Sequence, residues 1–128
     1  MPARNQARGF PRSGRAIRSC LLYTSVRVGY NAPEIEDAFP YVTLAKELGL
    51  KVCLNFMKTY GVSAELFGEK ARAAAAAGAG IIYCVDSAGS MFPEDVRRYL
   101  TAARELCNVT LGFHGHSNLC LLYTSRCV

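Results

Sequence analysis

Short apolar runs alternate with helical segments along the middle of this chain, and this alternation limits the folds that it can adopt. The apolar runs cover residues 26–30, 51–57, 81–86 and 109–116. The segments between them have helical patterns and cover residues 34–48, 63–77 and 93–107. Almost continuously apolar strands separated by helices are typical of a parallel sheet covered by helices. The sequence therefore predicts the α/β class with the order β-α-β-α-β-α-β.

Proline, serine and glycine mark where these helices begin and end. Pro33 lies at the start of the first helix and Gly49 at its end. Ser63 can cap the second helix, which Gly78 and Gly80 terminate. This pattern leaves two architectures open, a doubly wound open sheet and part of a closed barrel. The sequence contains neither G-x-G-x-x-G nor a Walker loop, and a complete (β/α)8 barrel needs about 200 residues or more.

The net charge of +5 is concentrated at the N-terminal end of the chain. Residues 1–19 hold five arginines and no acid, whereas residues 26–119 hold nine lysines and arginines against ten acids. Because the middle of the chain is close to neutral, we expect no nucleic-acid partner. No run approaches the roughly 18 apolar residues of a membrane span, so we expect no membrane partner either.

The six cysteines do not predict a disulfide framework. Three of them lie in the flanking segments, and Cys53, Cys84 and Cys107 are dispersed through apolar or helical segments. We interpret these last three as reduced, buried thiols of a cytoplasmic protein.

One hexapeptide, Cys-Leu-Leu-Tyr-Thr-Ser, occurs twice, at residues 20–25 and 120–125, in unlike surroundings. A repeat of the fold would extend over about 20 residues or more. The hexapeptide resembles the translation of a transposase adaptor used in sequencing libraries, whose inverted continuation would encode the final three residues, Arg-Cys-Val. We therefore expect a non-native or disordered Arg-rich segment at 1–25, a folded domain at 26–119 and an adaptor-like tail at 120–128.

The main chemical signal is the segment Phe-His-Gly-His-Ser-Asn at residues 113–118. Side chains alternate along a strand, so His114 and His116 project to the same side and can present two imidazoles to one ion. Active sites of parallel barrels lie at the carboxyl ends of the strands, and two histidines with a carboxylate suit a divalent cation. The alternative is that one histidine packs within the fold and the other is solvated.

A second polar motif, Asp86-Ser87-Ala88-Gly89, closes the preceding strand. Asp86 could orient a ligand or a positively charged neighbour, and Ser87 could donate a hydrogen bond to a substrate carboxylate or carbonyl. The alternative is that both residues only begin a turn or cap the next helix.

Residues 83–89 (YCVDSAG) and 111–119 (LGFHGHSNL) together resemble the 4-hydroxy-2-oxovalerate aldolases. These enzymes belong to the metallolyase group that includes isopropylmalate synthase and hydroxymethylglutaryl-CoA lyase. The likeness includes residues 26–28 and 48–52, so it covers nearly all of residues 26–119. It implies a partial (β/α)8 TIM barrel that holds about strands four to seven.

The resemblance also implies roles for five residues. His114 and His116 would bind Mn²⁺, or another divalent cation such as Mg²⁺ or Co²⁺. Ser87 and His114 would contact the substrate, and Asp86 and Asn118 would support the metal ligands. The substrate would be a small 2-oxo acid cleaved to pyruvate and an aldehyde, and an aldehyde dehydrogenase would be the partner protein.

The chain also departs from this family. The Arg-Asp pair expected in the first strand, the histidine expected to act as the base and the tyrosine expected after the last strand have no counterparts here. We therefore assign no catalytic residue and expect the chain as it stands to be an inactive, truncated chimera. A fragment of an isopropylmalate synthase or hydroxymethylglutaryl-CoA lyase-like enzyme is the alternative.

Overall fold

The computed structural model describes residues 25–118, which contain four strands and the helices that connect them. In chain order, with η denoting a 3-10 helix, the elements are β1 (Ser25–Asn31), η1 (Ala32–Ala38), α2 (Phe39–Glu47), β2 (Lys51–Met57), η2 (Thr59–Gly61), α3 (Ala64–Ala77), β3 (Ile81–Asp86), α4 (Pro93–Leu106) and β4 (Thr110–Gly115). The predicted alternation is confirmed. The adaptor-like segments lie outside the described residues, except that Ser25 is the first residue of β1.

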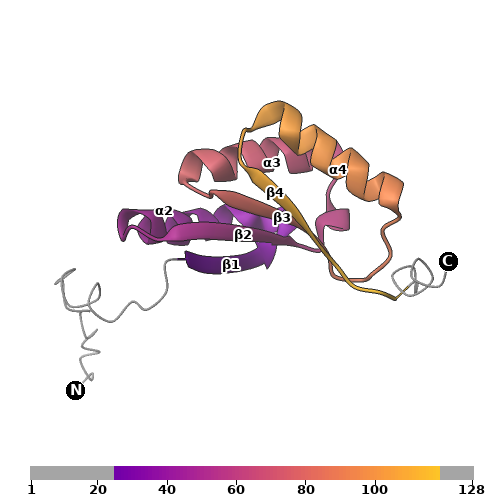
Figure 1. The fold of residues 1–128 in the computed structure, drawn as a ribbon, viewed down its shortest axis with the longest axis horizontal. Coiled ribbons are helices and arrows are strands. Elements are labelled where there is room, and N and C mark those ends of the chain that lie inside the picture. The colour runs from indigo at the N-terminus through magenta and orange to yellow at the C-terminus, as the bar shows by residue number, and fades with distance from the viewer. Residues whose placement is uncertain (1–24, 119–128) are drawn as a thin grey trace, which may run out of the picture.

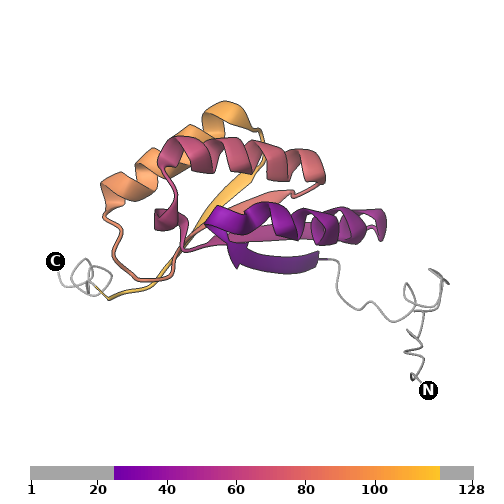
Figure 2. The ribbon, with the colours of Figure 1, turned by 180° about the vertical axis from the view of Figure 1, so that it is seen from behind.

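The four strands form one parallel sheet in the order β1-β2-β3-β4. Helices α2, α3 and α4 lie on one face of this sheet, and no described element covers the other face (Figures 1 and 2). A doubly wound sheet has helices on both faces, whereas a barrel has them only outside. The α/β class is therefore confirmed and the arrangement is consistent with part of a barrel. Its assignment to strands four to seven stays a prediction.

Each strand divides its side chains between a helix-facing side and an open side of the sheet. One register row on the helix-facing side contains Val28, Leu54, Ile82 and Leu111. The next row, on the open side, contains Gly29, Asn55, Tyr83 and Gly112. The helix-facing row packs into the core, and the open row does not. These two sides have different roles in the molecule.

The core lies between the helix-facing side and the helices. Phe67 of α3 packs edge-to-face on Phe56 of β2, with ring centroids 5.0 Å apart, and on Tyr99 of α4 at 5.7 Å. The Tyr99 hydroxyl donates to the Val62 carbonyl at 2.6 Å, so this polar group is satisfied within the core. Burial of one such aromatic side chain contributes about 1.5–3 kcal/mol. The aromatic cluster therefore joins the sheet to two helices.

The first helical segment differs from the single helix expected over residues 34–48. It is a 3-10 helix, η1, followed by the separate α-helix α2. Pro40 explains the division, because proline has no N–H with which to bond the carbonyl four residues earlier and its ring disfavours a helical residue before it. Pro40 instead occupies the first turn of α2. Gly49 follows this helix with φ of +80°, as the stop signal predicted.

The caps of α3 are as the sequence predicts. The Ser63 side chain accepts a hydrogen bond from the Leu66 N–H at 3.2 Å. Gly78 ends the helix with φ of +118°, a conformation that glycine adopts without a steric penalty. These two residues fix where α3 begins and ends.

The cysteines of the described region carry free thiols. Cys84 is buried, whereas Cys53 and Cys107 are partly exposed. Within residues 25–118, every helix is too short or too polar to cross a membrane.

Candidate metal and substrate site

The two histidines lie at the carboxyl end of β4. His114 pairs in register with Val85 of β3, and His116 follows the last residue of the strand. Their ring centroids are 5.4 Å apart with an interplanar angle of 39°, and both side chains are exposed. The strand thus brings the two imidazoles together, as strand alternation predicts.

The histidines share the open side of the sheet with several polar groups. A Cβ added to Gly112 would lie 2.5 Å from the Tyr83 ring, which places that ring on the side from which His114 projects. The Arg27 guanidinium lies 4.8 Å from the centroid of the Tyr83 ring. Among the described residues, the buried Asn55 Oδ1 has no hydrogen-bond partner. The open side is therefore more polar than the helix-facing side.

Ser87 lies at the carboxyl end of β3 and is hydrogen-bonded to the residue that follows the neighbouring strand β2. Its Oγ accepts a hydrogen bond from the Lys58 N–H at 3.0 Å. Because the hydroxyl accepts here, its own proton stays available to donate to a ligand. Lys58 has the left-handed conformation, with φ of 53° and ψ of 48°. Nothing in the sequence around Lys58 indicates a positive φ, so this contact could not be predicted from the sequence.

Asp86 is separated from the histidines. It is 2% exposed, and it shares the helix-facing side of β3 with Ile82 and Cys84. Its Oδ2 accepts a hydrogen bond from the Met91 N–H at 2.8 Å, which closes the turn after β3. Its Oδ1 is buried without a partner among the described residues. In this geometry Asp86 shapes the turn, and its carboxylate does not join the two imidazoles.

Asn118 connects the end of β4 to the same turn. Its Nδ2 donates a hydrogen bond to the Ala88 carbonyl. The neighbouring Ser117 Oγ is buried without a partner in the described region. Asn118 can therefore hold the main chain that follows the histidine pair, without contacting an ion itself.

The donor atoms suit a divalent cation but do not complete its site. Two neighbouring imidazoles are donors that Mn²⁺ and Co²⁺ accept. Within residues 25–118, no group of three or more His, Cys, Asp or Glu side chains could hold a metal ion. The described residues thus bring together two candidate ligands, His114 and His116.

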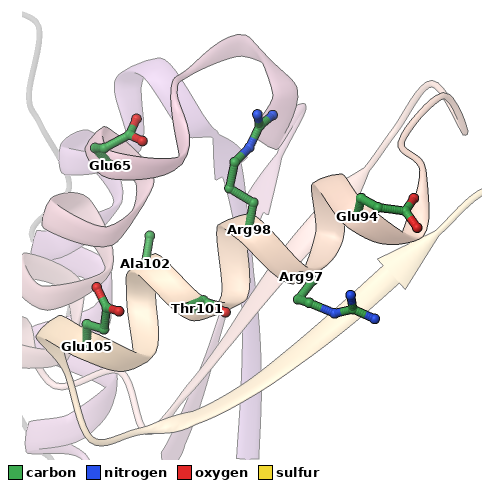
Figure 3. A pocket seen from close by; sticks show the side chains of 7 residues that line it. All are labelled: Glu65, Glu94, Arg97, Arg98, Thr101, Ala102 and Glu105. Carbon is green, nitrogen blue, oxygen red and sulfur yellow. The ribbon is translucent and has the colours of Figure 1, made fainter.

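Two hollows lie on the described part of the molecule, one at the strand ends and a larger one beside the helices. A hollow of about 260 Å³ at the carboxyl ends of β1 and β2 is lined by Gly29, Tyr30, Asn31, Glu34 and Met57. A hollow of about 420 Å³ lies between α3 and α4 on the outer side, where Glu65, Arg97, Arg98 and other α4 side chains surround it (Figure 3). The outer hollow is lined by glutamates and arginines and by neither histidine nor cysteine.

Known proteins resemble this chain over most of its described part. No protein-family model matches it. Over 94 residues it is 37% identical to a 4-hydroxy-2-oxovalerate aldolase of Bacillus thuringiensis, which corresponds to 73% of this chain and 28% of the relative. Over 96 residues it is 35% identical to an oxaloacetate decarboxylase of Mycobacterium tuberculosis, corresponding to 75% of this chain and 29% of the relative.

The fold has a counterpart among solved structures. The N-terminal domain of a Bacteroides vulgatus protein described as an aldolase matches with a TM-score of 0.64 and 27% identity, over 74% of this chain and 32% of that one. The chain spans less than a third of the length of these relatives. Over that part, sequence and fold both support a relationship to the 4-hydroxy-2-oxovalerate aldolases.

Proposed function

We propose that residues 26–119 are the central part of a divalent-metal-dependent aldolase that cleaves 4-hydroxy-2-oxo acids to pyruvate and an aldehyde. The observation that carries this proposal is the pair of imidazoles on the open side of β4, 5.4 Å apart, in a segment similar to aldolases. His114 and His116 would bind Mn²⁺, Mg²⁺ or Co²⁺. When bound, the cation would act as a Lewis acid toward the oxygens of the 2-oxo acid.

The chain's own residues would bind and orient the substrate. The Ser87 hydroxyl, which already accepts from Lys58, would donate its proton in a hydrogen bond to the substrate carboxylate or carbonyl. His114 would contact the substrate beside it. Asp86 and Asn118 would keep the turn and the end of β4 in place through their bonds to Met91 and Ala88.

The bond-breaking step needs a base that we place outside the described residues. That base would remove the proton of the C4 hydroxyl, so that the aldehyde carbonyl forms as the C3–C4 bond breaks. The electron pair of that bond would leave with the pyruvate fragment, which then takes a proton at C3. An aldehyde dehydrogenase that consumes the product would be the partner protein. The free thiols of the described region support a reducing, cytoplasmic location.

Decarboxylation of oxaloacetate is the second candidate reaction. One relative at 35% identity is an oxaloacetate decarboxylase. In both reactions a bond next to the 2-oxo acid breaks and a pyruvate fragment keeps the electrons, so the same binding residues would serve either one. The residues on the missing strands would decide between them.

Metal binding by the full chain tests this proposal directly. The chain has only two histidines, so any imidazole bound to Mn²⁺ must come from this pair. We expect electron spin echo measurements on the Mn²⁺-loaded chain to show imidazole nitrogen. His114→Ala and His116→Ala should each reduce that signal, whereas the outer-surface change Glu94→Gln should leave it intact.

A pyruvate assay adds the second measurement. We expect no pyruvate release from 4-hydroxy-2-oxovalerate or oxaloacetate above the rate with Mn²⁺ alone, because we place the base outside the described residues. Mn²⁺ binding without an imidazole signal would contradict the proposed metal site. Turnover that disappears in His114→Ala would show that the chain, contrary to our expectation, is active by itself.

A further inference from the structure

The turn between β3 and α4, residues 87–92, lies directly against the end of β4. Gly89 in this turn has φ of +65°. A Cβ at this position would lie 2.6 Å from the His116 carbonyl oxygen and 2.8 Å from the Asn118 nitrogen. Both atoms belong to the main chain, so neither could move away as the tip of a flexible side chain could. The end of β4 reaches this position only because residue 89 has no side chain.

Other bonds hold the same turn in place. Asn118 Nδ2 donates to the Ala88 carbonyl, which is a second contact between the turn and β4. Ser87 Oγ accepts from the Lys58 N–H, which ties the turn to the end of β2. Asp86 Oδ2 accepts from the Met91 N–H across the base of the turn. The turn is thus fixed independently of the histidines, and the end of β4 rests on it.

We propose that Gly89 is a positioning residue for His116, so that the β3–α4 turn sets where the second imidazole stands relative to the first. Real Cβ atoms essentially never lie within 3.0 Å of such atoms, so with a side chain at position 89 either the turn or the main chain of His116 would have to shift. Metal–ligand distances in genuine sites lie within about 0.2 Å of their ideal values, so a shift of the His116 main chain would disturb the placement of its imidazole. The inference rests on the proposed function, in which both histidines bind one divalent cation.

The chain offers a matched control for this position. Gly49 also has a positive φ, of +80°, but a Cβ there would meet nothing within 4 Å. Gly89→Ala and Gly49→Ala therefore share the backbone penalty and differ in the contact with β4. In a Mn²⁺ titration of the full chain, followed by the loss of the free Mn²⁺ resonance, we expect Gly89→Ala to bind about 10- to 100-fold more weakly. Gly49→Ala should bind within about twofold of the unaltered chain.

A second pair of variants separates positioning from folding. Asparagine tolerates a positive φ better than alanine does, so Gly89→Asn keeps the added Cβ with less backbone strain, and Gly49→Asn is its control. Both should unfold cooperatively, while only Gly89→Asn should lose affinity for Mn²⁺. If Gly89→Asn failed to fold while Gly49→Asn folded, the positioning role would be refuted, because the glycine would then serve folding alone.

A double-mutant cycle tests whether Gly89 acts through His116. If it does, Gly89→Ala should add nothing to the loss already caused by His116→Ala. The imidazole signal of Gly89→Ala should also resemble that of His116→Ala. A further tenfold loss in the double mutant would overturn the positioning role. The positioning role would also be overturned if the unaltered chain bound Mn²⁺ through imidazole and Gly89→Ala bound it with the same affinity. That result would leave the proposed function standing.

Discussion

The two sides of the sheet differ in how completely their side chains are packed. On the helix-facing side, Leu54 and Ile82 have no exposed surface. On the open side, the neighbouring Asn55 and Tyr83 are only partly buried, and Asn55 Oδ1 has no hydrogen-bond partner within residues 25–118. The stability of residues 25–118 therefore comes from one side, and the histidines lie on the other. It should be possible to change stability and metal binding separately.

The largest expected effect is a loss of stability when the aromatic cluster of the helix-facing side is disrupted. Phe67→Ala removes contacts with Phe56 and Tyr99 and leaves a cavity. We expect the free energy of unfolding to fall by about 3–5 kcal/mol, measured by urea denaturation. Tyr83→Ala, on the open side, is the control and should lower it by less than about 1.5 kcal/mol. Equal losses from the two variants would remove the contrast between the sides.

The next largest effect is a difference in alkylation rate between Cys84, on the helix-facing side of the sheet, and Cys53, on the open side. Burial raises the pKa of Cys84 to about 11, helped by the negative charge of Asp86 and opposed by a hydrogen bond with Thr59. At pH 8 we expect alkylation of Cys84 to be at least about a hundredfold slower in the folded chain than in urea, because the thiolate is the reactive form. Peptide mapping should show that Cys53, on the open side, reacts before Cys84. Rapid labelling of folded Cys84 would mean that the helix-facing side opens readily.

A smaller effect is expected at the ion pair between α3 and η1. Lys70 Nζ lies 2.5 and 2.7 Å from the two carboxylate oxygens of Glu36 and donates to the Pro33 carbonyl at 3.0 Å. Partial burial alone raises the pKa of Glu36, but the hydrogen bond and charge of Lys70, with a backbone hydrogen bond, lower it below its ordinary value of 4.5.

A lowered pKa in the folded state gives a contribution that is present above the pKa of the unfolded chain and is lost as the pH falls through the folded value. Between pH 7 and pH 3, the urea midpoint should therefore fall more steeply for the unaltered chain than for Glu36→Gln. The difference should be modest because the Glu36 side chain is 51% exposed. Parallel curves for the two proteins would show that this pair contributes nothing.

The smallest effect is expected from the cation–π contact of the open side. Arg27→Gln removes the guanidinium that lies 4.8 Å from the Tyr83 ring centroid. Such contacts contribute about 0.5–1 kcal/mol at exposed sites, so the urea midpoint should shift only slightly. Mn²⁺ affinity measured in parallel should stay unchanged. A loss comparable to that of Phe67→Ala would show that the open side also carries the fold.

The strands and most helix boundaries could be predicted because local patterns determine them. Residues 51–57 and 81–86 form strands with the predicted bounds, and Ser63 and Gly78 cap α3 as their types suggest. The helical pattern continues across Pro40, so it does not predict the division of this segment into η1 and α2. A proline at that position was the available signal.

The site could be predicted only as far as strand alternation extends. His114 and His116 are on one side because they lie two residues apart on a strand. The direction of Asp86 depends on the turn after β3, and the contact of Gly89 with His116 depends on how that turn meets β4. The Asp86 bond spans only five residues, whereas the contact of Gly89 with His116 is not local in sequence. A tertiary contact between residues 27 positions apart leaves no mark in the pattern of either segment.

The left-handed backbone of Lys58 has a practical consequence for anyone who wants a more robust version of this domain. A residue with a Cβ is strained in that conformation by roughly 1 kcal/mol, and asparagine is less so. The Lys58 N–H that bonds to Ser87 belongs to the main chain and would survive a change of side chain. Lys58→Asn is therefore a route to a sturdier scaffold that keeps the support of the candidate site.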